Sequence, residues 1–253
     1  MLKEMESWAR KAGRLQMDNF QKNIEIDSKD RKIDLVTEVD KKSEKILVDK
    51  ISTAYPDHSI MAEEGSNKSN DSRYCWIIDP LDGTVNYVHG FPIFAISLAL
   101  YKDDQPEYGL VYLPYFDDFY VAQRGQGSYY NGKRIHVDED YTVKDGIIAT
   151  GFPYSHQESN ESLELFNKIL PEAGGIRRTG AAAYDLCQVA SGVFSGFWEI
   201  ELNLWDIAAG ILLIEEAGGV ITDFKGKTLR MDSEQVVAGN KQVNYRLREI
   251  LNK

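Results

Sequence analysis

Apolar and polar positions in the first quarter of the chain predict two helices joined by a hairpin. Apolar residues recur at helical spacing in residues 2–22 and again in residues 38–55. Between them, residues 22–40 have the pattern of a β-hairpin with a charged tip at Ser28 to Lys32. We expect this tip to lie over a cleft and to respond to a bound metal.

Strand patterns dominate the rest of the first half. Residues 59–65 form a short apolar run that ends in acids, and Trp76 to Ile78 is bulky and apolar without polar alternation. Such a strand is usually covered on both faces. Three long β segments follow within residues 94–130, and Asn131-Gly132 is a hairpin signal. The first half is therefore predicted to be α+β with a large antiparallel sheet.

Strand and helix patterns alternate in the second half, from residue 146 to the end. This alternation is typical of an α/β unit. We place the boundary near residues 138–146. The prediction is an α+β subdomain at 1–140, carrying most of the candidate ligands, and an α/β subdomain at 141–253.

Composition narrows the possible functions. The 253 residues are 43% hydrophobic and 27% charged, as in ordinary soluble proteins. The apolar runs are too short to span a membrane, and the start "MLKEMESWARKAGRL" lacks the apolar middle of a signal peptide. We therefore expect a cytoplasmic protein with no membrane partner. Cys75 and Cys187 are too few for a disulfide framework and favour buried free thiols.

The net charge of −11 argues against a nucleic-acid partner, because such surfaces need an excess of lysine and arginine. The same acidity disfavours direct capture of an anionic substrate. Metal cations that bridge carboxylates to a phosphate would remove that difficulty. The alternative is that the acidity only keeps the protein soluble.

Acidic residues gather where apolar elements begin or end. Four short pieces supply them: Asp79 and Asp82 from "DPLDGT", Glu63 and Glu64 from "MAEEG", Asp206 from "LWDIAAG" and Asp40 from "DLVTEVD". We expect Pro80 to stop the strand ladder and to expose carbonyls such as that of Leu81. Histidine and cysteine are absent from these pieces, so the oxygen-only set favours Mg²⁺ over Zn²⁺.

Asp82-Gly83-Thr84 predicts the start of a helical turn, whose free backbone N–H groups suit a phosphate. One short segment would then hold both metal and phosphate. Such a site polarises a phosphoryl group and activates a water molecule. The pattern therefore predicts metal-assisted hydrolysis of a phosphate ester.

Each piece alone also has a purely structural explanation. "DPLDGT" can form a turn, and Glu63 with Glu64 can be a solvated pair. Asp206 and Asp40 can stabilise the N-termini of helices. The four histidines are scattered without metal spacing, which favours surface or packing roles for all of them.

Taken together, the pieces resemble the inositol monophosphatase family, within the lithium-sensitive, Mg²⁺-dependent sugar phosphatases. The matching stretches are "DLVTEVD", "AEEG", "WIIDPLDGTVNYVHGFP" and "WDIAAGILLIEEAGG", in the family's order and across nearly the whole chain. The resemblance implies a layered αβαβα sandwich of the inositol monophosphatase and fructose-1,6-bisphosphatase type. It also implies a small phosphorylated metabolite as substrate and a homodimer.

The resemblance also implies roles for single residues. The metal ligands, for two or three Mg²⁺ ions, are Glu63, Asp79, the carbonyl of Leu81, Asp82 and Asp206. Glu63 and Thr84 position the attacking water, with Asp40 hydrogen-bonded to Thr84, and no phosphoenzyme forms. The substrate contacts are Asp82, Gly83, Thr84, Gly180, Ala182, Glu199 and Asp206, and Glu199 meets the ring hydroxyls of the alcohol.

Several alternatives stay open. Inositol monophosphate is the first choice of substrate, followed by the 2′-phosphate of NADP or fructose 1,6-bisphosphate, and then 3′-phosphoadenosine 5′-phosphate. Ala181 stands where inositol-specific members often carry threonine, which would loosen contact with a polyol. Haloacid-dehalogenase phosphatases are disfavoured because their acids lie two apart, whereas Asp79 and Asp82 lie three apart. A non-catalytic metal- or phosphate-binding module is disfavoured because Glu63, Thr84 and Asp40 are all retained.

Overall fold

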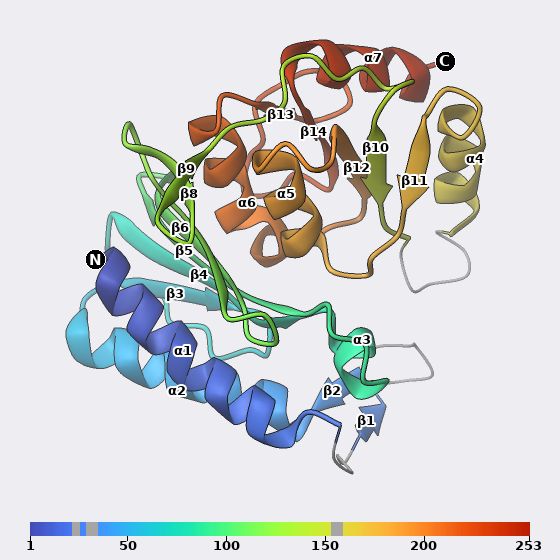
Figure 1. Cartoon of the computed structure of the whole chain (residues 1–253). Helices are drawn as coiled ribbons and strands as arrows, with labels where there is room; N and C mark the ends of the chain where they lie inside the picture. Colours follow the sequence, from blue (N-terminus) through green and yellow to red (C-terminus); the bar gives the residue numbers. More distant parts are fainter. Residues whose placement is uncertain (22–25, 29–34, 153–158) are drawn as a thin grey trace.

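Helical layers and β-sheets alternate through the molecule (Figure 1). The computed structural model describes residues 1–21, 26–28, 35–152 and 159–253. From one side to the other, the helical layers are α1 (Leu2–Asn19) with α2 (Glu38–Ala54), α5 (Ala182–Ala190) with α6 (Leu204–Glu216), and α4 (Ser159–Ile169) with α7 (Lys241–Leu251). One sheet lies in each gap between these layers, so the predicted αβαβα sandwich is confirmed.

The first sheet has seven strands in the described part of the chain, in the order β3-β4-β5-β6-β7-β8-β9. The strands are β3 (Ser59–Ala62), β4 (Tyr74–Asp82), β5 (Ala95–Lys102), β6 (Gln105–Leu113), β7 (Asp118–Gln123), β8 (Gly127–Tyr130) and β9 (Lys133–Ile135). All neighbours are antiparallel except β3 and β4. Asn131 and Gly132 have φ of 46° and 76° between β8 and β9, which confirms the predicted hairpin turn.

The second sheet, as described, has five strands in the order β11-β10-β12-β14-β13. They are β10 (Ile147–Thr150), β11 (Gly175–Arg177), β12 (Gly196–Ile200), β13 (Val220–Thr222) and β14 (Gln235–Gly239). Strand β10 runs parallel to both neighbours, while β14 is antiparallel to both of its own. The expected alternation of strands and helices is present. The division into two subdomains stays a prediction, because both sheets share the α5–α6 layer.

Strand β4 contributes side chains to a hydrophobic core on each face of the first sheet. Ile77 packs into the core shared with α5 and α6, while Trp76 and Ile78 pack into the core under α1 and α2. The expectation that this strand is covered on both faces is therefore confirmed. The expectation that Pro80 ends the strand is wrong, because β4 continues to Asp82. Pro80 sits in a bulge, where the ladder needs no donor from it.

The predicted hairpin after α1 is present as β1 (Ile26–Ser28) paired antiparallel with β2 (Leu35–Thr37). Its predicted tip, Ser28 to Lys32, lies almost entirely outside the described residues, so its place over the cleft stays a prediction. Among the described helices, none combines the length and apolar character that crossing a membrane requires.

Candidate functional site

The end of β4 carries two buried carboxylates in an irregular piece of strand. Asp79 pairs with Ser97 and Asp82 pairs with Ala95, and the register shifts between them. We call this segment the Asp79–Asp82 bulge. The N–H of Leu81 donates to Oδ1 of Asp79 over 2.9 Å, which curls the bulge around the first carboxylate. The two acids are 2% and 9% exposed, so their side chains point into the protein.

Helix α5 approaches the bulge from the second half of the chain. The N–H of Ala183, in its first turn, donates to Oδ2 of Asp82 over 2.8 Å. Gly83 lies against the residues just before this helix, because a Cβ on Gly83 would stand 3.2 Å from Cβ of Ala181 and 3.4 Å from the Gly180 carbonyl oxygen. The structure thus brings Gly83, Gly180 and the start of α5 with Ala182 together, as the substrate assignment needs.

Thr84 begins the short helix α3 (Thr84–Val88), with Gly83 in the left-handed conformation just before it. The Thr84 hydroxyl lies 3.3 Å from Oδ2 of Asp40 and 3.0 Å from the Leu81 carbonyl oxygen. The hydrogen bond between Thr84 and Asp40 is therefore present. The Leu81 oxygen retains a second lone pair for another partner.

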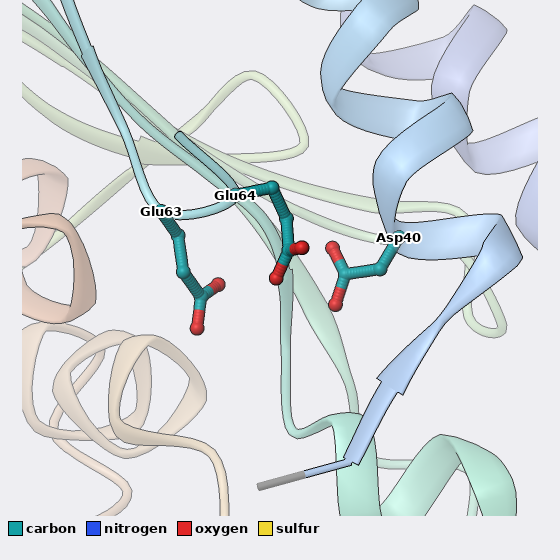
Figure 2. Close-up of side chains that lie close together, drawn as sticks. All are labelled: Asp40, Glu63 and Glu64. Carbon is teal, nitrogen blue, oxygen red and sulfur yellow. The ribbon is translucent and has the colours of Figure 1, made fainter. Parts of the chain in front are cut away.

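Figure 2 shows Glu63 and Glu64 on the turn after β3, with Asp40 at the start of α2 facing them. Their carboxylate oxygens lie within 4.8 Å of one another, and we call these three residues the acidic cluster. The N–H of Glu63 donates to the Ile78 carbonyl over 3.2 Å, which ties the turn to β4. Glu64 is half-buried rather than a solvated surface acid, which the sequence alone did not indicate.

Asp206 reaches the same region from the first turn of α6. Burial, and then the charge of Asp206, raise the pKa of Glu63 to about 7. Burial raises the pKa of Asp206 itself to about 6, against hydrogen bonding to Asn203, whose N–H donates to Oδ2 over 2.7 Å. The pKa values of Asp79 and Asp82 are raised well above the ordinary range, by burial first and then by neighbouring carboxylates. The charge of Asp206, from the second half of the chain, thus contributes to the raised pKa values of Glu63, Asp79 and Asp82 from the first half.

Glu199 lies beside this group on β12. Burial raises its pKa well above the ordinary value, with further contributions from the charges of Asp185, Asp206 and Asp82, while Arg178 opposes the shift. Asp185 was not anticipated from the sequence. It is 1% exposed and accepts a 2.8 Å hydrogen bond from the Thr179 hydroxyl. The feature of the sequence that could have indicated Asp185 is a charged residue in the largely apolar helix α5.

Two further polar residues behind the site were missed. Glu44 of α2 accepts hydrogen bonds from the N–H groups of Glu64 at 2.7 Å and Ser66 at 3.0 Å, and so shapes the turn that carries the acidic cluster. Gln16 of α1 contacts the Asp79–Asp82 bulge. Each lies four residues after another buried residue of its helix, Gln16 after Ala12 and Glu44 after Asp40. This spacing marks a buried helix face and is not part of a sequence motif.

The residues present fit a hard divalent cation. The donor set contains only oxygens, and the charges of Asp206 and Glu63 raise the pKa values of neighbouring carboxyls. Glu63 Oε2 is buried and makes no hydrogen bond within the described residues. Buried acids without a counter-charge are costly, so a cation in this group would relieve both burial and repulsion.

Comparison with known proteins places this geometry in a family. The family model described as "Inositol monophosphatase family" matches residues 1–253. The chain belongs to the inositol monophosphatase family. The resemblance found in the sequence is thus confirmed, and membership makes the chain one of a family of phosphatases that depend on metal.

Three relatives illustrate the likeness. A "Fructose-1,6-bisphosphatase/inositol-1-monophosphatase" of Aquifex aeolicus is 43% identical, over 92% of this chain and 88% of the relative. A "Putative Nus factor SuhB" of Neisseria meningitidis serogroup B is 42% identical, over 96% and 94%. The crystal structure of extragenic suppressor protein suhB from Bartonella henselae has a TM-score of 0.95 and 37% identity, covering 100% of this chain and 98% of that one.

Proposed function

We propose that this member of the inositol monophosphatase family hydrolyses inositol monophosphate with Mg²⁺ as cofactor. The observation that carries the proposal is the burial of Asp79 and Asp82 in one bulge of β4, with the N–H of Glu63 bonded to Ile78 just before them and the charge of Asp206 raising the pKa of Glu63. These carboxylates and the Leu81 carbonyl would hold two or three Mg²⁺ ions. The bound cations would neutralise phosphate charge and acidify the attacking water.

The remaining residues have roles that follow from their positions. The Thr84 hydroxyl has one proton and lies 3.3 Å from Oδ2 of Asp40 and 3.0 Å from the Leu81 oxygen. With the Leu81 oxygen held by a cation, that proton would go to Asp40, and the lone pairs of the Thr84 oxygen would be left to accept from a water. The family resemblance assigns Glu63 as the base that takes a proton from the attacking water. Backbone N–H groups of Gly83 and Thr84 bind the phosphate, and water attacks directly without a phosphoenzyme.

The alcohol side of the substrate is assigned to Gly180, Ala182 and Glu199. A carboxylate beside Asp82 and Asp206 offers acceptors to the hydroxyls of a polyol, which supports an inositol ring. The name of the Aquifex relative supports a second reading, a phosphatase that also accepts fructose 1,6-bisphosphate. The 2′-phosphate of NADP is a further substrate of this broad kind.

The first experiment measures phosphate release by the purified protein from inositol 1-phosphate, NADP, fructose 1,6-bisphosphate and 3′-phosphoadenosine 5′-phosphate. Each is assayed with Mg²⁺ and with chelator. We expect release that requires Mg²⁺ and is fastest for inositol 1-phosphate. Faster release from another substrate would replace the inositol assignment, and no release from any of them would reject turnover in favour of a non-catalytic binding module.

A variant pair separates catalysis from binding. Glu63→Gln keeps the size of the side chain and removes the base, while Glu139→Gln changes an exposed carboxylate in the loop after β9. We expect Glu63→Gln to lose at least about 100-fold in phosphate release, with substrate binding by calorimetry still measurable. Glu139→Gln should behave as wild type. An equal loss in both variants would contradict the role of Glu63.

Lithium inhibition, a homodimer and a cytoplasmic location are further parts of this proposal that rest on the family resemblance. Lithium would compete for a weakly held metal position. Inhibition by Li⁺ that added Mg²⁺ relieves, measured in the same release assay, is the expected result.

A further inference from the structure

Helix α1 contributes a fully buried polar side chain to the back of the candidate site. Its buried face is apolar along Met5, Trp8, Ala9 and Ala12, and the next position on this face is Gln16, which is 0% exposed. Nε2 of Gln16 donates to the Pro80 carbonyl oxygen over 2.7 Å. The distance to Oγ of Ser43 on α2 is 3.3 Å, so the bond to Pro80 is the shorter of the two.

The bulge needs such a partner because its own strand ladder does not supply one. Asp79 and Asp82 pair with β5, whereas Pro80 and Leu81 between them do not. A buried carbonyl without a donor is unfavourable, and Pro80 is buried. Elsewhere in the bulge, the Leu81 N–H donates to Asp79, the Leu81 oxygen lies 3.0 Å from the Thr84 hydroxyl, and Asp82 accepts from Ala183 of α5. Among the described residues, the donor to the Pro80 carbonyl is Gln16 of α1.

The cost of this arrangement argues for more than packing. Oε1 of Gln16 is buried and has no hydrogen-bond partner within the described residues. The amide orientation is set by Pro80, since a flipped amide would place two acceptors against each other. An apolar side chain of similar length would avoid the unpaired oxygen. The hydrogen bond from Nε2 to the Pro80 carbonyl therefore explains why a glutamine stands here.

We propose that Gln16 is a positioning residue, which fixes the Asp79–Asp82 bulge in the shape that presents both carboxylates and the Leu81 carbonyl to the Mg²⁺ ions. This inference rests on the proposed function. Its consequence is that the affinity for Mg²⁺ depends on a hydrogen bond donated from α1, although Gln16 itself is not a ligand. Residues that orient metal ligands in this way affect metal affinity roughly 10–100-fold.

Three variants isolate the bond to Pro80. Gln16→Met removes the donor and keeps the length. Tyr87→Phe removes the 2.7 Å hydrogen bond from the Tyr87 hydroxyl to the main-chain oxygen of Gln16, so it loosens the same residue without touching Pro80. Ser43→Ala removes the other neighbour of Nε2. Each variant loses one buried contact around Gln16. Only Gln16→Met removes the hydrogen bond to the Pro80 carbonyl in the bulge.

Mg²⁺ binding to chelator-treated protein is measured by calorimetry, together with thermal unfolding in chelator and Mg²⁺-dependent phosphate release. We expect Gln16→Met to raise the dissociation constant for Mg²⁺ by about 10-fold or more, while Tyr87→Phe and Ser43→Ala stay within about twofold of wild type even where unfolding shows a similar loss of stability. Phosphate release by Gln16→Met should recover at high Mg²⁺.

An unchanged Mg²⁺ affinity in folded Gln16→Met would overturn the inference and leave the proposed function standing. An equal loss of affinity in all three variants would also overturn it, because the effect would then follow stability alone. If Gln16→Met does not fold, Gln16→Leu removes the donor with a shorter apolar side chain, and wild-type Mg²⁺ affinity in that variant would be decisive against the inference. A wild-type protein with neither Mg²⁺ binding nor Mg²⁺-dependent release would overturn both proposals.

Discussion

The backbone N–H of Ala183 donates a 2.8 Å hydrogen bond to Oδ2 of Asp82, which ties the first turn of α5 to the Asp79–Asp82 bulge. The two residues are 101 positions apart in sequence, with Asp82 at the end of β4 and Ala183 in α5. A free N–H at a helix start stabilises a carboxylate, so this contact holds Asp82 in place while leaving its second oxygen for a cation. Assembly of the site therefore depends on docking the second half of the chain onto β4.

This contact predicts that the variants Asp82→Asn and Asp82→Ala differ in their free energy of unfolding but lose Mg²⁺-dependent phosphate release to a similar extent. The asparagine oxygen still accepts from Ala183 and the charge is removed, whereas alanine leaves that buried N–H without a partner. In chelator, we expect Asp82→Ala to be less stable than Asp82→Asn by about 1–3 kcal/mol. Both should lose at least about 100-fold in Mg²⁺-dependent release.

Urea unfolding in chelator and the phosphate assay measure these two effects. Equal unfolding free energies for the two variants would contradict the role of the Ala183 contact. Normal turnover of Asp82→Asn at saturating Mg²⁺ would contradict the ligand assignment, because a neutral amide binds Mg²⁺ poorly.

The raised pKa values predict a pH dependence of stability that Mg²⁺ removes. Burial raises the pKa values of Glu63 and Asp206 to about 7 and about 6 in the folded protein, from ordinary values of 4.5 and 3.8. At a pH between the ordinary pKa and the raised pKa of either group, the folded state binds more protons than the unfolded state. The free energy of unfolding therefore falls as pH rises through this range. Chelated protein should therefore lose stability from about pH 4 to pH 7.

Saturating Mg²⁺ should flatten this profile, because a cation favours the ionised carboxylates. Urea unfolding across this pH range, with chelator and with Mg²⁺, checks the prediction. Glu63→Gln is the control and should show a shallower fall in chelator. Identical profiles with and without Mg²⁺ would mean that these carboxyls do not share a cation.

Most of the fold could be predicted from sequence because its patterns are local. The apolar run Trp76 to Ile78 is covered on both faces as expected, and Asn131-Gly132 turns between two strands. Pro80 was misjudged for a physical reason. Proline lacks a donor, which suggests the end of a ladder, but a bulge also removes the need for that donor. The bulge is supported by Gln16, 64 residues away.

The candidate site was predictable only in part. Asp79 and Asp82 stand in a distinctive motif, and Asp206 starts an apolar helix, so resemblance identified all three. Glu44 and Gln16 belong to helix faces and not to motifs, and their partners are backbone groups of distant turns. Sequence patterns indicate which residues are buried, while the choice of hydrogen-bond partner depends on tertiary packing.

The conformation of Gly83 predicts a specific cost for an added side chain. Its φ is +88°, and a Cβ there would stand 3.0 Å from the Ile93 carbonyl oxygen. Gly132 has a similar φ of +76° with nothing within 4 Å of its Cβ position, so Gly132→Ala is the matched control. Both substitutions should cost about 1–2 kcal/mol from the left-handed backbone, and Gly83→Ala should cost more because of the contact.

Phosphate binding should distinguish the two variants further. Inhibition of turnover by inorganic phosphate reports on the backbone N–H groups of Gly83 and Thr84, and we expect it to weaken in Gly83→Ala and to stay unchanged in Gly132→Ala. Unchanged inhibition in folded Gly83→Ala would place the phosphate elsewhere.

His58 predicts an acid-side loss of stability that is separate from the site carboxylates. Its Nδ1 accepts a 3.1 Å hydrogen bond from Trp76 Nε1, and its ring stacks between Tyr55 and Tyr74 with centroid distances of 5.0 and 4.7 Å. Burial lowers the pKa of His58, with Asp57 opposing and Lys68 adding to the shift. Protonation would abolish the acceptor, so the imidazole is held neutral. This agrees with a packing role for this histidine.

His58→Phe keeps the stacked ring and removes both the acceptor and the titration. Because the pKa of His58 is depressed in the folded protein, its stabilising effect is present above the ordinary pKa of about 6.5 and is lost as pH falls through the folded value. The stability difference between wild type and His58→Phe should therefore shrink on acidification. Urea unfolding followed by tryptophan fluorescence measures the difference, since Trp76 is the donor. A difference that stays constant from pH 8 to pH 5 would show that the hydrogen bond does not depend on a neutral imidazole.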